Sequence, residues 1–398
     1  MRLAAAERRR LHTTFESLCR IPSPTGHERE VADWLIRELS AVGLKVEEDD
    51  AGRSAGADAG NLLVRIPARD PGRAPVAGAG ARSVLLCAHM DTVPPTAPLE
   101  PVQIDGGWEN AGDGILGADN KAAVAALVEL ARILGRDELA LPVDVELLFT
   151  VSEETGLHGA KAFDLGRLRS EFGYVFDHAS PLGEIVVASP TYMRIVAEVR
   201  GRAAHAGLHP ELGVSAISAA ARAVAAMPQG RLDPETTANV GTISGGTAAN
   251  VVPERCRLEA EVRGLDQARV DSVLTDCIDA IEDAVDEGAC DLDLEVAQMF
   301  SGYRIRAGEP SIRVAERALT SIGYQPRQVT SGGGADANAL RAVGFPCTNL
   351  ANGTERPHEP GERVSCAALE SGLDLALALL GAAADVEAAD LEGSGGDG

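Results

Sequence analysis

An alternation of apolar strands with helices is the feature that most constrains how this chain can fold. The segments SVLLCA (83–88), VDVELLFTV (143–151) and FGYVF (172–176) are apolar almost throughout, which is typical of strands buried on both faces. The other predicted elements of this alternation are helices at 120–134, 311–323 and 367–380 and a strand at 345–350. Strands separated by helices predict an α/β fold, with a mainly parallel sheet covered by helices on both faces.

The middle of the chain follows a different pattern. The segments TYMRIVAEVRG and CRLEAEVRG alternate apolar and polar residues as half-buried strands do, and helices are predicted between and after them. The order strand, helix, strand, strand, helix predicts a separate α+β domain at 190–304. This domain would be inserted into a first domain formed by residues 1–189 and 305–385. The acidic, Gly-rich tail at 386–398 is predicted to be disordered, and residues 68–81 are predicted to form a surface loop.

Composition excludes several classes of partner. The formal net charge of −24 over 398 residues argues against binding to nucleic acids or to anionic membranes. Every apolar stretch is expected to be too short to cross a bilayer, and no secretory signal follows the N-terminal arginines. The seven cysteines show no CxxC spacing, which predicts neither a disulfide framework nor a zinc ribbon. A cytoplasmic location is therefore expected.

Acidic residues and histidines gather where the predicted strands end. In an open parallel sheet, ligands bind beyond the carboxyl ends of the strands, so these positions are informative. The residues concerned are His89, Asp91, Glu153, Glu154, Asp177 and His358, together with Asp119 at the start of the helix at 120–134. Two imidazoles and several carboxylates are ligands of a zinc-like ion, and they outnumber the ligands that one tetrahedral ion needs. Two cations that share a bridging carboxylate would use them all.

Neighbouring residues in this set suggest different roles. A histidine that binds a metal donates its other ring N–H to a carboxylate, and Asp91 is placed to accept it from His89. Glu153 and Glu154 would point in opposite directions on a strand, so one is expected to bind a cation and the other to take a proton from metal-bound water. Each residue also has a structural interpretation on its own, because the two glutamates or Asp119 could cap a helix. As a set, they favour a metal site.

Longer motifs resemble those of a known enzyme family. The segments LLCAHMDTVPP, GILGADNKAAVAAL, TVSEETGLHGAK and GRAAHAGLHPELGVSAI are similar to the motifs of the co-catalytic di-zinc exopeptidases, the family of aminoacylase, carboxypeptidase G and peptidase T. The segments TTANVGTISGGTAANVVPE and GGGADANAL indicate its peptidase T-like branch. The resemblance covers residues 10–380, with the motifs in the family's order. It implies a catalytic domain at 1–189 and 305–385 and, at 190–304, a lid that contacts the substrate and in many members forms a homodimer.

The resemblance also implies a role for each residue at the strand ends. It assigns two zinc ions, with cobalt or manganese as alternatives, to these ligands: His89 and Asp177 on one, Glu154 and His358 on the other, and Asp119 bridging both. Asp91 would orient His89, and Glu153 would be the general base that activates the bridging water. His178, next to Asp177, departs from the family's pattern and is interpreted as a bystander.

Three residues of the inserted domain match positions that hold the substrate in this family. His205 would stabilise the tetrahedral oxyanion, and Asn250 and Arg263 would hold the carboxylate or backbone of the substrate. The glycine-rich turn Gly332–Gly334 would line the active site, where backbone must come close to the substrate, and Asp336 would order that turn.

The resemblance leaves the substrate open. An aspartate at position 177 is what the aminopeptidase-type members carry, so the expected activity is hydrolysis of the N-terminal peptide bond of short peptides such as tripeptides and dipeptides. Carboxypeptidase-type or acyl-amino-acid amidohydrolase cleavage would use the same metal site. A non-catalytic binding homologue is a more remote alternative, because every expected ligand and the base are present.

Overall fold

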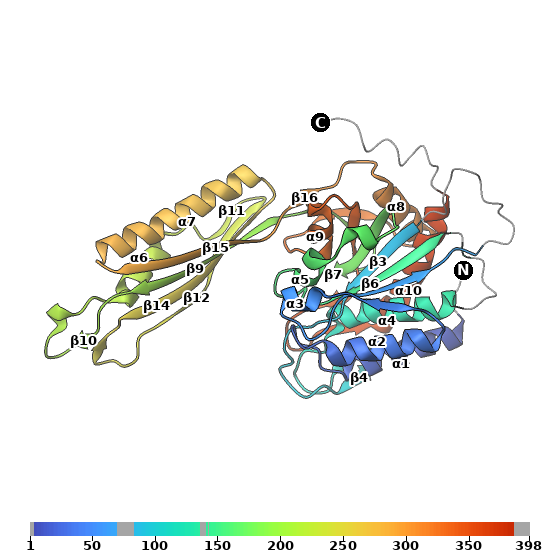
Figure 1. The fold of residues 1–398 in the computed structure, drawn as a ribbon, viewed down its shortest axis with the longest axis horizontal. Helices are drawn as coiled ribbons and strands as arrows, with labels where there is room; N and C mark the ends of the chain where they lie inside the picture. The colour runs from blue at the N-terminus through green and yellow to red at the C-terminus, as the bar shows by residue number, and fades with distance from the viewer. Residues whose placement is uncertain (1–3, 70–82, 136–140, 142, 386–398) are drawn as a thin grey trace. The chain divides into compact units, whose positions relative to one another are not determined.

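The computed structural model describes residues 4–69, 83–135, 141 and 143–385 (Figure 1). Most of the surface loop predicted at 68–81 lies outside the described residues. The tail at 386–398, predicted to be disordered, also lies outside them.

The chain divides into two compact units. The first unit contains Met1–Val187, Ile305–Ser331 and Ala335–Gly398, and the second contains Ala188–Arg304 with Gly332–Gly334. Residues 190–304, the predicted insertion, fall within the second unit. The first unit is therefore formed by chain that precedes the second unit in the sequence together with chain that follows most of it.

The main sheet is nine-stranded within the described residues, and all its strands except Tyr303–Arg304 begin in the first unit. Its strands are, in spatial order, β1 (Val46–Glu48), β2 (Leu62–Ile66), β6 (Asp144–Thr150), β3 (Ser83–His89), β7 (Phe172–His178), β18 (Cys347–Ala351), β8 (Glu184–Ser189) and β16 (Tyr303–Arg304), with β17 (Arg327–Thr330) paired to β8. The four central strands β6, β3, β7 and β18 run parallel, whereas the flanking strands β2 and β8 pair antiparallel with them. This arrangement confirms the predicted α/β fold with a mainly parallel central sheet.

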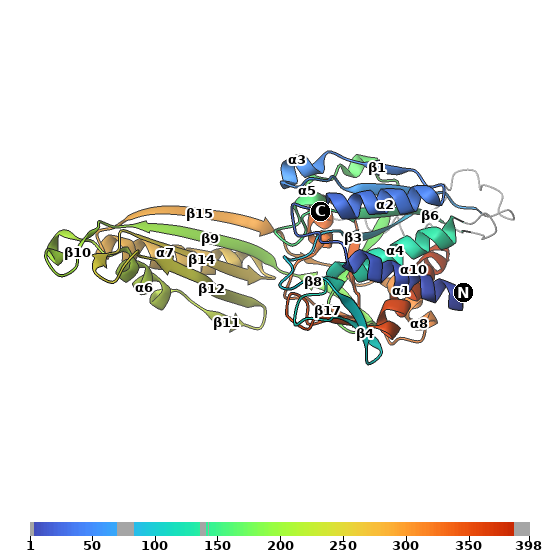
Figure 2. The ribbon, with the colours of Figure 1, turned by 90° about the horizontal axis from the view of Figure 1, so that it is seen from below.

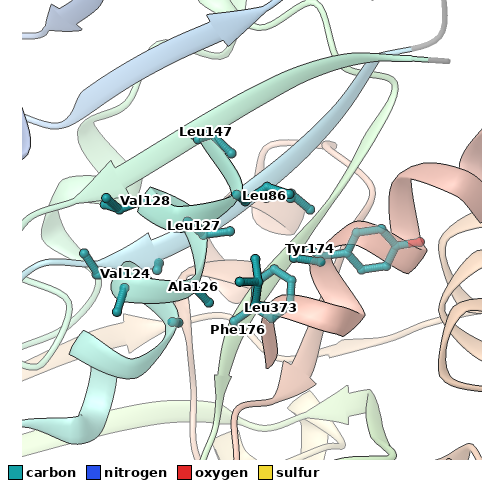
Figure 3. Packing of buried hydrophobic residues seen from close by; sticks show 14 of the residues in the cluster. Leu86, Val124, Ala126, Leu127, Val128, Leu147, Tyr174, Phe176 and Leu373 are labelled. Atoms are coloured by element: carbon teal, nitrogen blue, oxygen red, sulfur yellow. The ribbon is translucent and has the colours of Figure 1, made fainter. Parts of the chain in front are cut away.

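Helices cover both faces of this sheet. One face packs against α1 (Ala5–Cys19), α2 (Arg29–Ala41), α4 (Ala118–Leu134), α8 (Pro310–Ser321) and α10 (Cys366–Ala384). Figure 3 shows part of this core, with Leu86, Leu147, Tyr174 and Phe176 of the strands beside Leu127 of α4 and Leu373 of α10. The shorter helices are α3 (Ala51–Ala55), α5 (His158–Ala162), the 3₁₀ helix η1 (Leu165–Arg167) and α9 (Asp336–Ala342). Of these, α9 contacts β7, β18 and α5, and so supplies cover for the other face.

The helix α10 is an exception to the expectation that every apolar stretch is too short to cross a bilayer. It has 19 residues and is long and apolar enough to do so by length and composition. Its leucines, including Leu369, Leu373 and Leu379, are buried in the core of the first unit. Packing against α4 and α8 therefore accounts for its apolar composition.

A small second sheet in the first unit was not predicted. Its strands, in spatial order, are β19 (Thr354–Glu355), β20 (Arg363–Ser365), β5 (Gly107–Asn110) and β4 (Pro101–Ile104). These strands have two to four residues each and lie in segments rich in Gly and Pro, so they carry little periodicity that could be detected in the sequence. The hairpin of β19 and β20 matters for function because it holds residues 356–362 between its strands.

The second unit is an antiparallel sheet with helices on one face (Figures 1 and 2). Its strands, in spatial order, are β11 (Gly230–Asp233), β12 (Thr236–Gly245), β14 (Arg255–Gly264), β9 (Thr191–Arg200) and β15 (Asp291–Phe300). Along β14, Cys256, Leu258, Ala260 and Val262 are buried and the residues between them are more exposed, because α6 (Ala216–Ala226) and α7 (Gln267–Glu287) cover one face only. A two-stranded sheet of β10 (Ala204–His205) and β13 (Val251–Val252) and the 3₁₀ helix η2 (Pro210–Leu212) complete the unit.

Candidate metal centre

The candidate ligands lie at the carboxyl ends of the parallel strands. His89 is the last residue of β3, Glu154 follows the end of β6, and Asp177 is next to last in β7. Asp119 lies in the first turn of α4, and His358 lies between β19 and β20. Parallel strands end at the same edge of a sheet, so side chains that are far apart in sequence meet there.

These five residues form two groups that share Asp119. In the first group, His89 Nε2 lies 3.3 Å from Asp177 Oδ1 and 3.7 Å from Asp119 Oδ1. In the second group, His358 Nε2 lies 2.9 Å from Glu154 Oε2 and 3.5 Å from Asp119 Oδ2. Within each group, one potential ligand atom per residue lies within 4.8 Å of the others. The two carboxylate oxygens of Asp119 thus face different groups.

The chemistry of the donor set fits two divalent cations. Asp119 Oδ1 is buried and has no hydrogen-bond partner among the described residues, although a buried carboxylate oxygen needs one. Burial raises the pKa of Asp177 to about 8, and it also raises the pKa of Glu154. Crowded, buried carboxylates are stabilised in their charged form by a bound cation. Imidazole and carboxylate ligands suit zinc, manganese or cobalt.

His89 is oriented by Asp91, though chiefly through the main chain. Its Nδ1 lies 2.9 Å from the carbonyl oxygen of Asp91 and 3.4 Å from Oδ1 of the same residue. Donation from Nδ1 leaves the Nε2 lone pair free for a cation. The Asp91 carboxylate instead accepts hydrogen bonds from the backbone N–H groups of Glu153, at 3.0 Å, and Glu154, at 3.2 Å. It therefore holds the turn that follows β6, a role that sequence reasoning did not assign to it.

Glu153 lies in this turn and is only 8% exposed. Because β6 ends at Thr150, the alternation of side chains along a strand does not separate Glu153 from Glu154, contrary to the prediction. The two glutamates differ instead in their contacts. Glu154 lies within hydrogen-bond distance of His358, whereas Glu153 belongs to neither ligand group. Burial, with Asp177 close by, raises the pKa of Glu153 well above its ordinary value. A carboxyl group of this kind can take up and hold a proton.

Other polar residues fix the ligands and were missed by sequence reasoning. The fully buried Glu362 accepts hydrogen bonds from the backbone N–H groups of Leu116, Gly117 and Asp119, at 2.9, 2.7 and 2.9 Å. It thereby ties the start of α4 to the β19–β20 hairpin. Asn349 brackets the backbone of Asp177, accepting from its N–H at 3.0 Å and donating to its carbonyl at 3.2 Å. An acid four residues after His358 was the one available signal for Glu362.

Two residues near the ligands make other contacts. His178 Nε2 lies 3.1 Å from Glu184 Oε2 and belongs to neither ligand group, which agrees with its interpretation as a bystander. Asp336 was expected to order the turn Gly332–Gly334, but its carboxylate accepts a hydrogen bond from the hydroxyl of Thr150 at the end of β6. The need for glycine in that turn has another cause. A Cβ at Gly334 would lie 2.3 Å from the ring of Phe300.

Within the second unit, His205 and Asn250 lie side by side and Arg263 lies elsewhere. The strands β10 and β13 pair next to them, and Ala206 N–H donates to the Asn250 carbonyl at 2.9 Å. His205 Nδ1 accepts from the N–H groups of Gly207 and Leu208, both at 3.2 Å, so its Nε2 carries the proton.

Arg263 lies near the far end of β14. The residues 255 to 263 span about 27 Å of strand, and His205 and Asn250 lie beyond the opposite end at Arg255. The Arg263 guanidinium bonds to Glu261 at 3.0 Å and stacks on the Tyr192 ring at 4.3 Å. Thus the unit does not bring the three predicted substrate contacts together.

Comparisons with known proteins identify two peptidase domains and a relative that is similar over most of the chain. A model of the peptidase dimerisation domain matches residues 188–289, and a model of peptidase family M28 matches residues 62–178. The uncharacterized protein YqjE of Bacillus subtilis is 35% identical over 376 residues, covering 94% of this chain and 99% of that protein.

Two solved structures are similar over nearly the whole chain. The aminopeptidase PepT of Bacillus cereus has 37% sequence identity and a TM-score of 0.80, and the alignment covers 95% of this chain and 99% of that one. A tripeptidase of Staphylococcus aureus has 32% identity and a TM-score of 0.85, with the same coverage. These matches confirm the resemblance to the peptidase T-like branch. The chain belongs to the M20 family of metal-dependent peptidases, alongside these PepT-type enzymes.

Proposed function

We propose that this protein is a zinc-dependent exopeptidase that removes the N-terminal residue from tripeptides and other short peptides. The observation that carries the proposal is the pair of ligand groups joined by Asp119, with the unliganded, buried Glu153 beside them. Aminopeptidase and tripeptidase are the descriptions of the two solved structures that are similar over 95% of the chain. Removal of the first residue from a tripeptide is consistent with both activities.

Each residue has a role in the proposed mechanism. His89 and Asp177 would hold one cation, Glu154 and His358 the other, and Asp119 both. When bound, the cations supply Lewis acidity toward the scissile carbonyl and lower the pKa of water. Glu153 accepts a proton from the attacking water and delivers it to the departing nitrogen. Asp91 keeps Glu153 in place through the backbone.

We assign substrate contacts to the second unit. The exposed His205 presents an Nε2–H that can donate to the developing oxyanion, and Asn250 beside it can bind the peptide backbone. Glu261 already occupies the Nε–Nη2 edge of the Arg263 guanidinium, so a substrate carboxylate would bind the Nη1–Nη2 edge or displace Glu261.

We also propose a homodimer formed through the second unit. In β12, only residues 236–238 pair with β11, so residues 239–245 have an unpaired edge within the described structure. This edge carries Ile243, which is 47% exposed, and the neighbouring α6 exposes Ile217. An unpaired edge with apolar side chains can accept a strand from a second copy. The match to a peptidase dimerisation domain at 188–289 supports this assignment.

A cytoplasmic location is part of the proposal. All seven cysteines are free in the described residues, which suits a reducing compartment.

A panel of substrates tests the activity. The zinc-loaded protein is incubated with a free tripeptide, the same tripeptide acetylated at its N-terminus, and N-acetyl amino acids, and products are identified by mass spectrometry. We expect release of the first residue from the free tripeptide and no reaction of the acetylated one. Release of the C-terminal residue would indicate a carboxypeptidase, and cleavage of the N-acetyl amino acids alone would indicate an amidohydrolase. Either result would overturn the proposal.

A further inference from the structure

The segment between α1 and α2 forms a strap, residues 23–28, against the end of β3. Ser23 Oγ donates to the carbonyl of Met90 at 2.9 Å, and the N–H of Thr92 donates to the Ser23 carbonyl at 2.9 Å. Thr25 N–H donates back to the Thr92 carbonyl at 3.2 Å, and its hydroxyl donates to Asp91 Oδ2 at 2.8 Å. The strap is thus fixed to the segment that contains His89 and Asp91.

Glu28, the last residue of the strap, reaches the turn that follows β6. It is fully buried, and its Oε1 accepts from the N–H of Gly26 and the N–H of Ser152, each at 3.0 Å. The hydroxyl of Ser152 lies 3.4 Å from the same oxygen. Ser152 has a φ of 51°, a left-handed conformation that a residue with a side chain adopts only when its surroundings hold it there.

Two buried carboxylates therefore hold three successive backbone N–H groups. Glu28 accepts from residue 152, and Asp91 accepts from residues 153 and 154. These three residues carry the proposed base and one proposed ligand. Asp91 is tied to the His89 ring, whereas Glu28 touches none of the proposed ligands or the base through its side chain.

We propose that Glu28 is a positioning residue, which sets the backbone of the 152–154 turn so that Glu153 and Glu154 reach their working positions. The inference rests on the proposed function of that turn. A change in the length of the Glu28 side chain would withdraw its Oε1 from Ser152 and let the turn relax. A displacement of about 1 Å in such a group can lower catalysis about 100-fold.

Glu146 provides a control with similar contacts through one oxygen, while its Oε1 accepts from Arg65 Nε at 3.0 Å. It is 1% exposed and its Oε2 accepts from the N–H groups of Arg169 and Ser170, each at 2.9 Å, and from the Ser170 hydroxyl at 2.6 Å. It is thus another buried glutamate that holds a turn through two N–H groups and a serine hydroxyl. This turn precedes β7, at the edge of the sheet opposite the ligands.

The experiment compares Glu28→Asp and Glu28→Gln with Glu146→Asp and Glu146→Gln. Glutamine keeps an acceptor oxygen at the same length, and aspartate keeps the charge but shortens the side chain. For tripeptide hydrolysis by the zinc-loaded proteins, we expect Glu28→Asp to lower kcat at least about tenfold with KM within about threefold, and Glu28→Gln to stay near wild type. Both Glu146 variants should keep kcat near wild type even where they lower Tm.

Cobalt(II) titration, followed by absorption, gives a readout that does not depend on turnover. We expect Glu28→Asp to weaken one of the two binding steps about tenfold, because Glu154 lies in the displaced turn, and to leave the other step unchanged. A wild type that cleaves no peptide would overturn the proposed function, yet the titration would still report on Glu28. The inference fails if Glu28→Asp matches wild type in both measurements, or if Glu146→Asp with an equal loss of Tm shows the same losses.

Discussion

Asp119 shows how single residues define this site. Its two oxygens face two different imidazoles, and Glu362 fixes its backbone N–H. The residue types and their places at strand ends could be read from the sequence, because apolar runs mark the strands and acids or histidines follow several of them. The supporting contacts could not, since Glu362 and Glu28 act through hydrogen bonds to backbone atoms more than 100 positions away.

Glu153 offers the most direct test at this scale. The substitution Glu153→Gln keeps the size of the side chain but removes its ability to accept a proton, so kcat should fall about 10²- to 10⁴-fold. Metal content and Tm should stay near wild type, because Glu153 belongs to neither ligand group. Turnover assays combined with metal analysis by mass spectrometry check this. The control is His178→Ala, which alters a histidine bonded to Glu184 and should retain two cations. Substantial activity in Glu153→Gln would rule out the base assignment.

At the scale of elements, the predicted strands and helices of the first unit are present because their apolar runs are long and continuous. Several strands escaped prediction, among them β8 of the main sheet, the short strands β4, β5, β19 and β20, and the edge strand β15. The sequence of β15, DLDLEVAQMF, does alternate, but its acids and its exposure at the sheet edge weaken the apolar signal. The hairpin of β19 and β20 was the important omission, because it determines where His358 and Glu362 lie.

The hairpin's hold on α4 can be measured. In Glu362→Ala, three backbone N–H groups lose their acceptor in a buried place, where each unsatisfied group costs about 1–3 kcal/mol. We therefore expect the free energy of unfolding to fall by about 3 kcal/mol or more, measured by urea denaturation of the zinc-loaded protein. Glu359 lies in the same segment and is exposed, so Glu359→Ala should stay within about 0.5 kcal/mol of wild type. Equal effects of the two substitutions would contradict the anchoring role.

The free edge of β12 makes a separate prediction. A lysine in place of Ile243 would put a charge on the strand that we propose meets its partner, so the dimer dissociation constant should rise at least about tenfold. Analytical ultracentrifugation over a range of concentrations measures it. Val343, which is 63% exposed in the first unit, gives a matched control, and Val343→Lys should dimerise as wild type does. A wild type that stays monomeric at high micromolar concentration would refute the dimer itself.

At the scale of the whole molecule, the site couples stability to pH in a direction that depends on the cations. Burial raises the pKa of Asp177 from 3.8 to about 8 and that of Glu362 from 4.5 to about 7. Hydrogen bonds to Asp119 and Glu154 raise the pKa of His358 from 6.5 to about 10. Between its lower and upper value, each group is protonated in the folded chain and deprotonated in the unfolded chain. Stability therefore falls as the pH rises through these windows.

The chelated protein should accordingly lose stability between about pH 5 and pH 8. Cation binding requires deprotonated ligands, so zinc should stabilise the fold more strongly as the pH rises. At a zinc concentration 100 times the dissociation constant, binding at one site adds about 2.7 kcal/mol to the free energy of unfolding. As the pH rises, we expect Tm to fall in EDTA and to fall less, or to rise, in zinc. Differential scanning calorimetry at three pH values in both buffers checks this. Parallel slopes in the two buffers would show that these groups do not bind the cations.

The first unit is formed from parts of the chain that are synthesised before and after most of the second unit. Synthesis proceeds from the N-terminus, and residues 1–187 emerge with His89, Asp119, Glu154 and Asp177 before the whole of the second unit is translated. Strand β18 and the hairpin with His358 come only afterwards. A chain that stops before His358 lacks one residue of the second ligand group, so we expect it to hold at most one of the two proposed cations.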